Sequence, residues 1–272
     1  MIVWGKVIGA GGIGAPGGWD ISTAALVHGF SVSAQETSPT GIFFTPDGTK
    51  MYVTGYTNDS VYEYDLSTAL DVTTASFLQS FSVSAQESAP ADLFFKPDGA
   101  KMYIVGIGGD EINEYDLSTA WDVSSSAFLQ NTKVNTEDDR PSGMFFKPDG
   151  TKVYVVGDTN KAIFEYDLST AWDSSTISLV QSFSVSAQAT SPRTIFFKPD
   201  GTKMYLVGDD SGAIFEYDLS TAWDVSTSSL LQSFSVASED TSPTGLFFTL
   251  DGTKMYVAGF VNDTVHEYNL AG

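Results

Sequence analysis

The sequence predicts an all-β fold, a five-bladed β-propeller whose blades are four-stranded antiparallel sheets. Three observations predict it. Five copies of a 51-residue unit follow one another from Gly18 to Gly272 without insertion or deletion. Each unit contains four short runs rich in aromatic and β-branched residues. A tandem unit of this length with four short strands is typical of a propeller blade.

The strands follow from the first unit. Residues 40–45, 51–55, 61–66 and 77–83 are apolar or alternating runs bounded by turn residues, which is typical of strands. Residues 46–49 read Pro-Asp-Gly-Thr, where proline presets φ and glycine accepts a positive φ, so the first two strands form a tight hairpin. A four-residue polar loop, 56–59, joins the second and third strands.

The ends of the chain predict how the ring closes. The last unit stops after its third strand, at residues 264–270, whereas the chain begins with an unpaired fourth strand at residues 26–32. Pairing these two segments completes the fifth blade and removes an exposed sheet edge. We therefore expect a 3+1 closure in which the N-terminal strand completes the last blade.

Two regions are predicted along the chain. Residues 18–272 form one propeller, and residues 1–17 are an apolar, glycine-rich extension outside the repeat. Four glycines interrupt its apolar stretch, so we expect no signal peptide. The extension is either a leader packed loosely against the ring or a segment that docks the propeller onto a larger assembly.

Composition limits the partners. A formal net charge of −21 and a pI near 4.1 oppose binding to nucleic acid, and the chain has no cysteine for disulfides or thiolate metal sites. No run approaches the roughly 20 apolar residues of a membrane span. We expect an extracellular or virion-surface location.

The segment 97–105, Pro-Asp-Gly-Ala-Lys-Met-Tyr-Ile-Val, and its four counterparts are each followed by a polar loop and a Glu-Tyr strand. In this pattern the unit resembles the YVTN-type repeats of bacterial and viral β-propellers, over residues 18–272. It departs from them in the Trp-Asp pair that opens most units and in having five blades. The resemblance implies a β-propeller and, less specifically, a surface or phage-associated binding protein or a lactone hydrolase.

The two rims of the ring differ in their loops. The Asp-Gly turns hardly vary between units, whereas the loops on the opposite rim do, and variable loops on a rigid scaffold favour a binding face. We expect this variable rim to be strongly acidic. Its acidic residues are Glu36, Glu87, Asp92, Asp110, Glu111, Glu137, Asp138, Asp139, Asp158, Asp209, Asp210, Glu239 and Asp240.

Six residues of this rim are candidate ligand-binding residues. Arg140 and Arg193 are the only arginines, and their planar heads suit a carboxylate or phosphate; alternatively, Arg140 neutralises the acidic residues at 137–139. Tyr56 and Phe260 occupy the same loop position in two units, where an aromatic ring stacks on a sugar. Asp158 and Asp209 are the acidic members of the set.

No catalytic residue and no metal site are predicted. Glu63 recurs at the same place in every unit, which favours a structural carboxylate bonded within or between blades. We expect no cofactor. Calcium stays an open alternative without support, because the oxygen-bearing residues at 158–160 lack the spacing of a calcium loop.

These observations favour a non-catalytic recognition module that binds a glycan, peptide or protein on the variable rim, displayed on a phage virion or cell surface. The alternative is a lactonase- or glycosidase-like hydrolase with its site at the mouth of the central channel.

Overall fold

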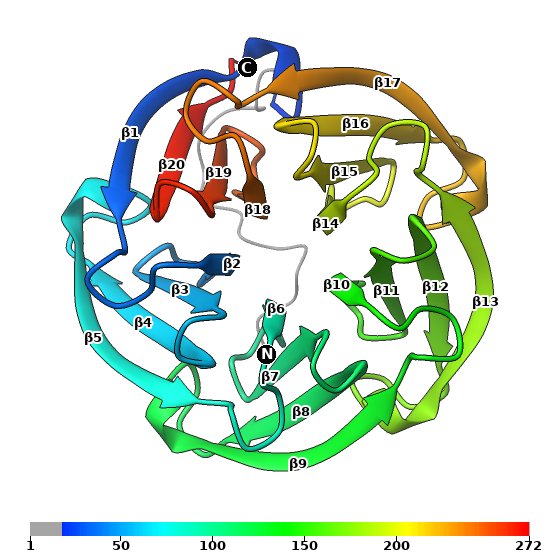
Figure 1. Ribbon diagram of the computed structural model, residues 1–272, viewed down its shortest axis with the longest axis horizontal. Coiled ribbons are helices and arrows are strands. Elements are labelled where there is room, and N and C mark those ends of the chain that lie inside the picture. Colours follow the sequence, from blue (N-terminus) through cyan, green and yellow to red (C-terminus); the bar gives the residue numbers. More distant parts are fainter. Residues whose placement is uncertain (1–17, 272) are drawn as a thin grey trace, which may run out of the picture.

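The computed structural model describes residues 18–271, so the predictions for residues 1–17 lie outside the described residues. Five four-stranded antiparallel sheets surround a central channel as the blades of a propeller (Figure 1). The predicted fold class is confirmed. No helix among residues 18–271 is long and apolar enough to cross a membrane.

The inner strand of each blade lines the channel and begins at a proline. These strands are β2 (Pro39–Phe44), β6 (Pro90–Phe95), β10 (Pro141–Phe146), β14 (Pro192–Phe197) and β18 (Pro243–Phe248). The second strands are β3 (Lys50–Gly55), β7 (Lys101–Gly106), β11 (Lys152–Gly157), β15 (Lys203–Gly208) and β19 (Lys254–Gly259). Both sets are almost wholly buried, because each blade is covered by neighbours on both faces.

The third strands are β4 (Ser60–Leu66), β8 (Glu111–Leu117), β12 (Ala162–Leu168), β16 (Ala213–Leu219) and β20 (Thr264–Asn269). The outer strands are β5 (Ala75–Ser82), β9 (Ser126–Lys133), β13 (Ile177–Ser184), β17 (Ser228–Ser235) and β1 (Ala25–Ser31). A short 3-10 turn precedes each outer strand: η1 (Ile21–Thr23), η2 (Val72–Thr74), η3 (Val123–Ser125), η4 (Ser174–Thr176) and η5 (Val225–Thr227). We number the blades from β2–β5 (blade 1) to β18–β20 with β1 (blade 5).

Strand β1 closes the ring. It pairs antiparallel with β20, from Ala25 opposite Asn269 to Ser31 opposite Thr264, so the fifth sheet has the order β1-β20-β19-β18. Figure 1 shows the two differently coloured ends of the described chain joined in this one blade. The predicted 3+1 closure is confirmed.

Cross-strand ion pairs lie on the rim of the constant Asp-Gly turns. Lys50 lies opposite Asp65, and their charged atoms are 2.7 Å apart. The same lysine is 2.6 Å from the buried carboxylate of Glu63, which also accepts hydrogen bonds from Gln79 and from the backbone N–H of Val123 in blade 2. Glu63 therefore joins neighbouring blades, as its repetition predicts.

Tryptophans form a second link between blades. Trp121 adopts a φ of 67°, packs on the ring of Phe95, and its carbonyl accepts a 2.6 Å hydrogen bond from the Tyr52 hydroxyl of blade 1. Its ring covers Gly99, where a Cβ would lie 2.5 Å from the indole and φ is +73°. Only glycine fits that turn without strain. The two kinds of link hold the inner strands, and hence the channel, in place.

Candidate functional site

Five phenylalanines block the central channel. Phe43, Phe94, Phe145, Phe196 and Phe247 occupy the same position of the five inner strands, and neighbouring ring centroids are 5.2–5.6 Å apart around the whole circle. All five side chains are buried. The channel is therefore a blind pocket that opens on the variable rim, and the phenylalanine ring is its floor.

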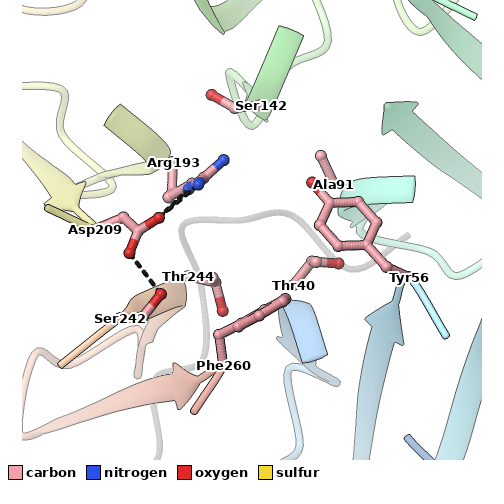
Figure 2. A pocket seen from close by; sticks show the side chains of 9 residues that line it. All are labelled: Thr40, Tyr56, Ala91, Ser142, Arg193, Asp209, Ser242, Thr244 and Phe260. Carbon is pink, nitrogen blue, oxygen red and sulfur yellow. Dashed lines mark hydrogen bonds and ion pairs between the residues drawn. The ribbon is translucent and has the colours of Figure 1, made fainter. Parts of the chain in front are cut away.

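A cavity of about 80 Å³ occupies the mouth of this pocket. The residues that line it are Thr40, Tyr56, Ala91, Ser142, Arg193, Asp209, Ser242, Thr244 and Phe260 (Figure 2). Thr40, Ala91, Ser142, Arg193 and Thr244 are the equivalent second residues of the five inner strands. The cavity is thus built from all five blades.

Three hydroxyls at the mouth are structural. Thr40, Ser142 and Thr244 each donate a 2.8–2.9 Å hydrogen bond to the carbonyl of the first proline in the next blade. Because these side chains are buried and already donate, they fix the distance between inner strands. Arg193 and Ala91 replace them in the other two blades.

Arg193 and Asp209 form an ion pair in the wall of the cavity. Nε and Nη2 of Arg193 lie 2.9 and 2.5 Å from one carboxylate oxygen of Asp209. The other oxygen accepts a 2.5 Å hydrogen bond from the Ser242 hydroxyl of blade 5 (Figure 2). The register of blade 4, with Pro192 opposite Gly208, places these two side chains side by side. A guanidinium held in this way presents its remaining N–H groups, on Nη1 and Nη2, as fixed donors.

Two of the sequence candidates are aromatic residues of the same cavity. Tyr56 follows β3 and Phe260 follows β19, and their ring centroids are 6.3 Å apart in an edge-to-face arrangement. Burial raises the pKa of the Tyr56 hydroxyl, so this group is a neutral donor. The structure therefore brings together Arg193, Asp209, Tyr56 and Phe260.

The other two candidates lie outside this cavity wall. Arg140 is exposed, and its Nε lies 3.2 Å from a carboxylate oxygen of Asp158. This pairing differs from the alternative expectation that Arg140 neutralises residues 137–139. The difference arises because the backbone N–H of Asp158 bonds to the Arg140 carbonyl and places the two side chains together.

Sequence reasoning missed the deepest polar residue of the pocket. Asp92 is one residue beyond Ala91 on β6, and its side chain lies inside the channel rather than on the rim. Its carboxylate accepts hydrogen bonds from the N–H of Leu93 (2.9 Å), the N–H of Met144 (3.1 Å) and the Thr194 hydroxyl (2.5 Å). Burial raises the pKa of Asp92 to about 7. A carboxylate with such a pKa exchanges its proton near neutrality.

A small cavity of about 20 Å³ lies beside Asp92, between it and the phenylalanine floor. Roughly 10–15 Å³ is enough for one water molecule. A signal for Asp92 existed in the sequence: the equivalent positions hold Gly41, Gly143 and Gly245, and Thr194 is the other exception. The two exceptions are the pair that meets across the channel.

The predicted acidity of the variable rim needs correction. Six of its thirteen acidic residues are buried: Glu36, Glu87, Asp92, Glu111, Asp138 and Asp240. Glu36 accepts hydrogen bonds from the N–H groups of Ser38 and Thr57, and Asp138 from those of Arg140 and Asn160. These carboxylates stabilise the conformation of the rim loops, because the backbone N–H groups of a loop outside regular strand pairing need other hydrogen-bond acceptors.

Metal ligands are not gathered in the part of the chain that the structure describes. Within residues 18–271, no group of three or more His, Cys, Asp or Glu side chains is arranged to hold a metal ion. The carboxylates in the pocket are instead hydrogen-bonded to protein donors. Asp92, with its raised pKa, and Arg193 support acid–base and hydrogen-bond chemistry.

Comparison with known proteins identifies a family to which the chain is similar. The family model described as "Lactonase, 7-bladed beta-propeller" matches residues 27–222, more than half of the chain. A search of curated proteins found no significant match. The matching family is not a YVTN-type repeat family, so the predicted resemblance is confirmed only as far as a β-propeller.

Solved structures show the same fold at low identity. A protein of unknown function from Desulfotomaculum acetoxidans superimposes with a TM-score of 0.52 and 14% identity, covering 86% of this chain and 70% of that one. A candidate 6-phosphogluconolactonase from Bacteroides uniformis superimposes with a TM-score of 0.50 and 14% identity, covering 81% of this chain and 64% of that one. A second candidate 6-phosphogluconolactonase, from Bacteroides fragilis, superimposes with a TM-score of 0.50 and 15% identity, covering 86% of this chain and 71% of that one.

The family match contradicts the expectation of a non-catalytic recognition module. A lactonase family supports the alternative, a hydrolase at the channel mouth. The equivalence of the repeated glutamates favoured recognition over catalysis, with the hydrolase as the alternative. The signal for a catalytic site lies in the polar residues that break the repeat inside the channel, which are Asp92, Arg193 and Thr194.

Proposed function

Because the chain belongs to the lactonase family of β-propellers, although it has five blades where the family description has seven, we propose that it is a hydrolase that opens a lactone ring at the mouth of its central channel. The observation that carries this proposal is the asymmetry of the pocket. A fivefold repeat places one arginine and one buried aspartate in otherwise small or apolar positions of a blind channel.

The first requirement of lactone hydrolysis is a group that stabilises negative charge on the carbonyl oxygen. Arg193 is suited to it, since Asp209 holds the guanidinium by Nε and Nη2 and leaves Nη1 and the second N–H of Nη2 for a substrate carbonyl. A fixed donor of this kind stabilises the tetrahedral intermediate without reorganisation. Asp209 acts here as a positioning residue, itself held by Ser242.

The second requirement is a base for the attacking water. Asp92 has a pKa of about 7 and borders a cavity of about 20 Å³, large enough for one water molecule. In the proposed reaction, that water attacks the carbonyl carbon while Asp92 accepts its proton. The carbon–oxygen bond of the ring then breaks, and the proton passes to the departing ring oxygen, giving the open hydroxy acid.

The test is hydrolysis of simple lactones, followed as acid release in a pH-stat against the spontaneous rate. The wild-type protein is expected to accelerate the reaction. Arg193→Gln and Asp92→Asn should each lower kcat by about 100-fold or more. The control is Lys147→Ala, which removes an exposed ion pair with Asp149 on the opposite rim and should leave the rate unchanged. Absence of acceleration, or full activity of both pocket variants, would overturn the proposal.

A further inference from the structure

The two sides of the mouth cavity differ in chemistry. Figure 2 shows the Tyr56 ring on one side and the Arg193–Asp209 pair on the other, with Phe260 beside the cavity. The aromatic side comes from blades 5 and 1, and the charged side from blade 4. A ligand between them therefore meets ring carbon on one face and hydrogen-bond donors on the other.

The charged side has little capacity left for an anion. Arg193 is the single cationic residue among those that line the cavity. Asp209 occupies Nε and one N–H of Nη2 and balances the positive charge of the guanidinium, so an anion would meet only the end-on pair of Nη1 and Nη2 on an already neutralised group. The remaining N–H groups suit a neutral carbonyl oxygen.

The surrounding charge also opposes an anionic ligand. Asp92 follows Ala91 of the cavity wall and lines the smaller cavity of the channel, and the chain carries a formal net charge of −21. A phosphorylated substrate would add negative charge next to Asp209 and Asp92. Like charges at such a site cost affinity, and they also slow the approach of the ligand.

From this we infer the substrate class, and the inference rests on the proposed function: the pocket takes a small neutral lactone with a hydrocarbon or aromatic face and discriminates against lactones that bear a phosphate or carboxylate. Tyr56 and Phe260 contact the apolar face, and Arg193 contacts the carbonyl oxygen. The cavity of about 80 Å³ is small beside the roughly 300–1,000 Å³ of drug-sized ligand sites, so the ligand is a small lactone of one or two rings.

The experiment compares kcat/KM for three lactones at one ionic strength: dihydrocoumarin, glucono-δ-lactone and 6-phosphoglucono-δ-lactone. We expect dihydrocoumarin to be the best substrate, and the phosphorylated lactone to be at least about tenfold worse than its neutral counterpart. Faster hydrolysis of the phosphorylated lactone would overturn this inference alone. No acceleration of any of the three would overturn the proposed function and this inference with it.

Two variants test the two sides of the cavity separately. Asp209→Asn removes the negative charge that balances the guanidinium, so the preference for the neutral over the phosphorylated lactone should fall by about tenfold. Phe260→Ala should raise KM for dihydrocoumarin by about fivefold through lost contact with the ring. Its neighbour Val261 is exposed and outside the cavity wall, so Val261→Ala is the matched control. An unchanged preference in Asp209→Asn, or equal effects of the Phe260 and Val261 variants, would contradict the assignment.

Discussion

The carboxylate of Asp92 accepts a 2.5 Å hydrogen bond from the hydroxyl of Thr194, which lies two blades further round the channel. Both residues stand where the other three blades have glycine. The glycines let the inner strands approach: a Cβ on Gly143 would lie 2.3 Å from the Arg193 carbonyl oxygen. The two side chains thus meet in space that the repeat itself leaves free.

The Thr194 hydroxyl controls the pKa of Asp92. Burial raises this pKa to about 7, and the hydrogen bond from Thr194 opposes the rise. Thr194→Val removes the donor, so the Asp92 pKa should increase by about one unit. If Asp92 is the base, the pH at which hydrolysis reaches half its maximum moves upward by the same amount. A pH–rate profile measures it, and a midpoint that stays in place would exclude Asp92 from the reaction.

Stability should also depend on the ionisation of Asp92. Its pKa is about 7 in the folded chain and 3.8 in an ordinary setting, so between these values the folded state binds a proton that the unfolded state lacks. The contribution of Asp92 to the free energy of unfolding therefore falls as pH rises from about 4 to 7, by at most about 1.4 kcal/mol per unit. It is constant above that range.

Urea unfolding of the wild type and Asp92→Asn at several pH values checks this linkage. The variant lacks the titrating group, so wild-type stability relative to it should decline between pH 4 and 7 and then level off. Parallel curves for the two proteins would show that Asp92 titrates normally.

Glu63 contributes to stability through its place between blades. Its buried carboxylate binds Lys50, Gln79 and the N–H of Val123. Glu63→Gln leaves the lysine without its buried partner and should lower the free energy of unfolding by about 3 kcal/mol. Asp65→Asn removes the exposed partner of the same lysine and should cost about 1 kcal/mol or less. Similar losses in the two variants would contradict the bridging role.

Leu70 occupies the position at which the other four units have tryptophan. Its φ of 62° is close to the 67° of Trp121, and its carbonyl likewise accepts a hydrogen bond from a tyrosine, Tyr256. Leu70→Trp should therefore place an indole over Phe44, as Trp121 covers Phe95, and raise the free energy of unfolding by about 1 kcal/mol. Thermal unfolding measures it, with Trp121→Leu expected to show a loss of similar size.

The features that follow from the repeat, namely the strand pairing within a blade and the closure of the ring, could be predicted from the sequence. Strand pairing fixes Lys50 opposite Asp65, and the missing strand of the last unit fixes the pairing of β1 with β20. How deep a side chain lies in the channel could not be predicted in this way. Asp92 was assigned to the rim because it lies near a loop in the sequence, whereas the second and third residues of an inner strand already lie inside the pocket.

The partners of the site residues were equally hard to predict. Arg193 and Asp209 share a blade, so the hairpin register could have paired them, but Ser242 and Thr194 reach their partners from other blades. Contacts between blades depend on the curvature of the ring, and the sequence of one unit does not determine that curvature. The sequence signal for the site lies in the differences between equivalent positions, since each functional candidate in the channel breaks the repeat.

Asn113 breaks the repeat in a way that we expect to cost stability. The equivalent residues Tyr62, Phe164 and Phe215 are buried aromatics, whereas Asn113 is fully buried and neither its Oδ1 nor its Nδ2 has a hydrogen-bond partner within residues 18–271. An unsatisfied buried amide costs about 1–3 kcal/mol. Asn113→Phe removes that cost and restores the apolar contact, so the free energy of unfolding should rise by about 1–2 kcal/mol. The reciprocal variant, Phe164→Asn, should lower it by about 3 kcal/mol or more. Denaturant unfolding of both proteins measures these changes. A less stable Asn113→Phe would contradict the prediction and would mean that the buried amide hydrogen-bonds to a bound molecule.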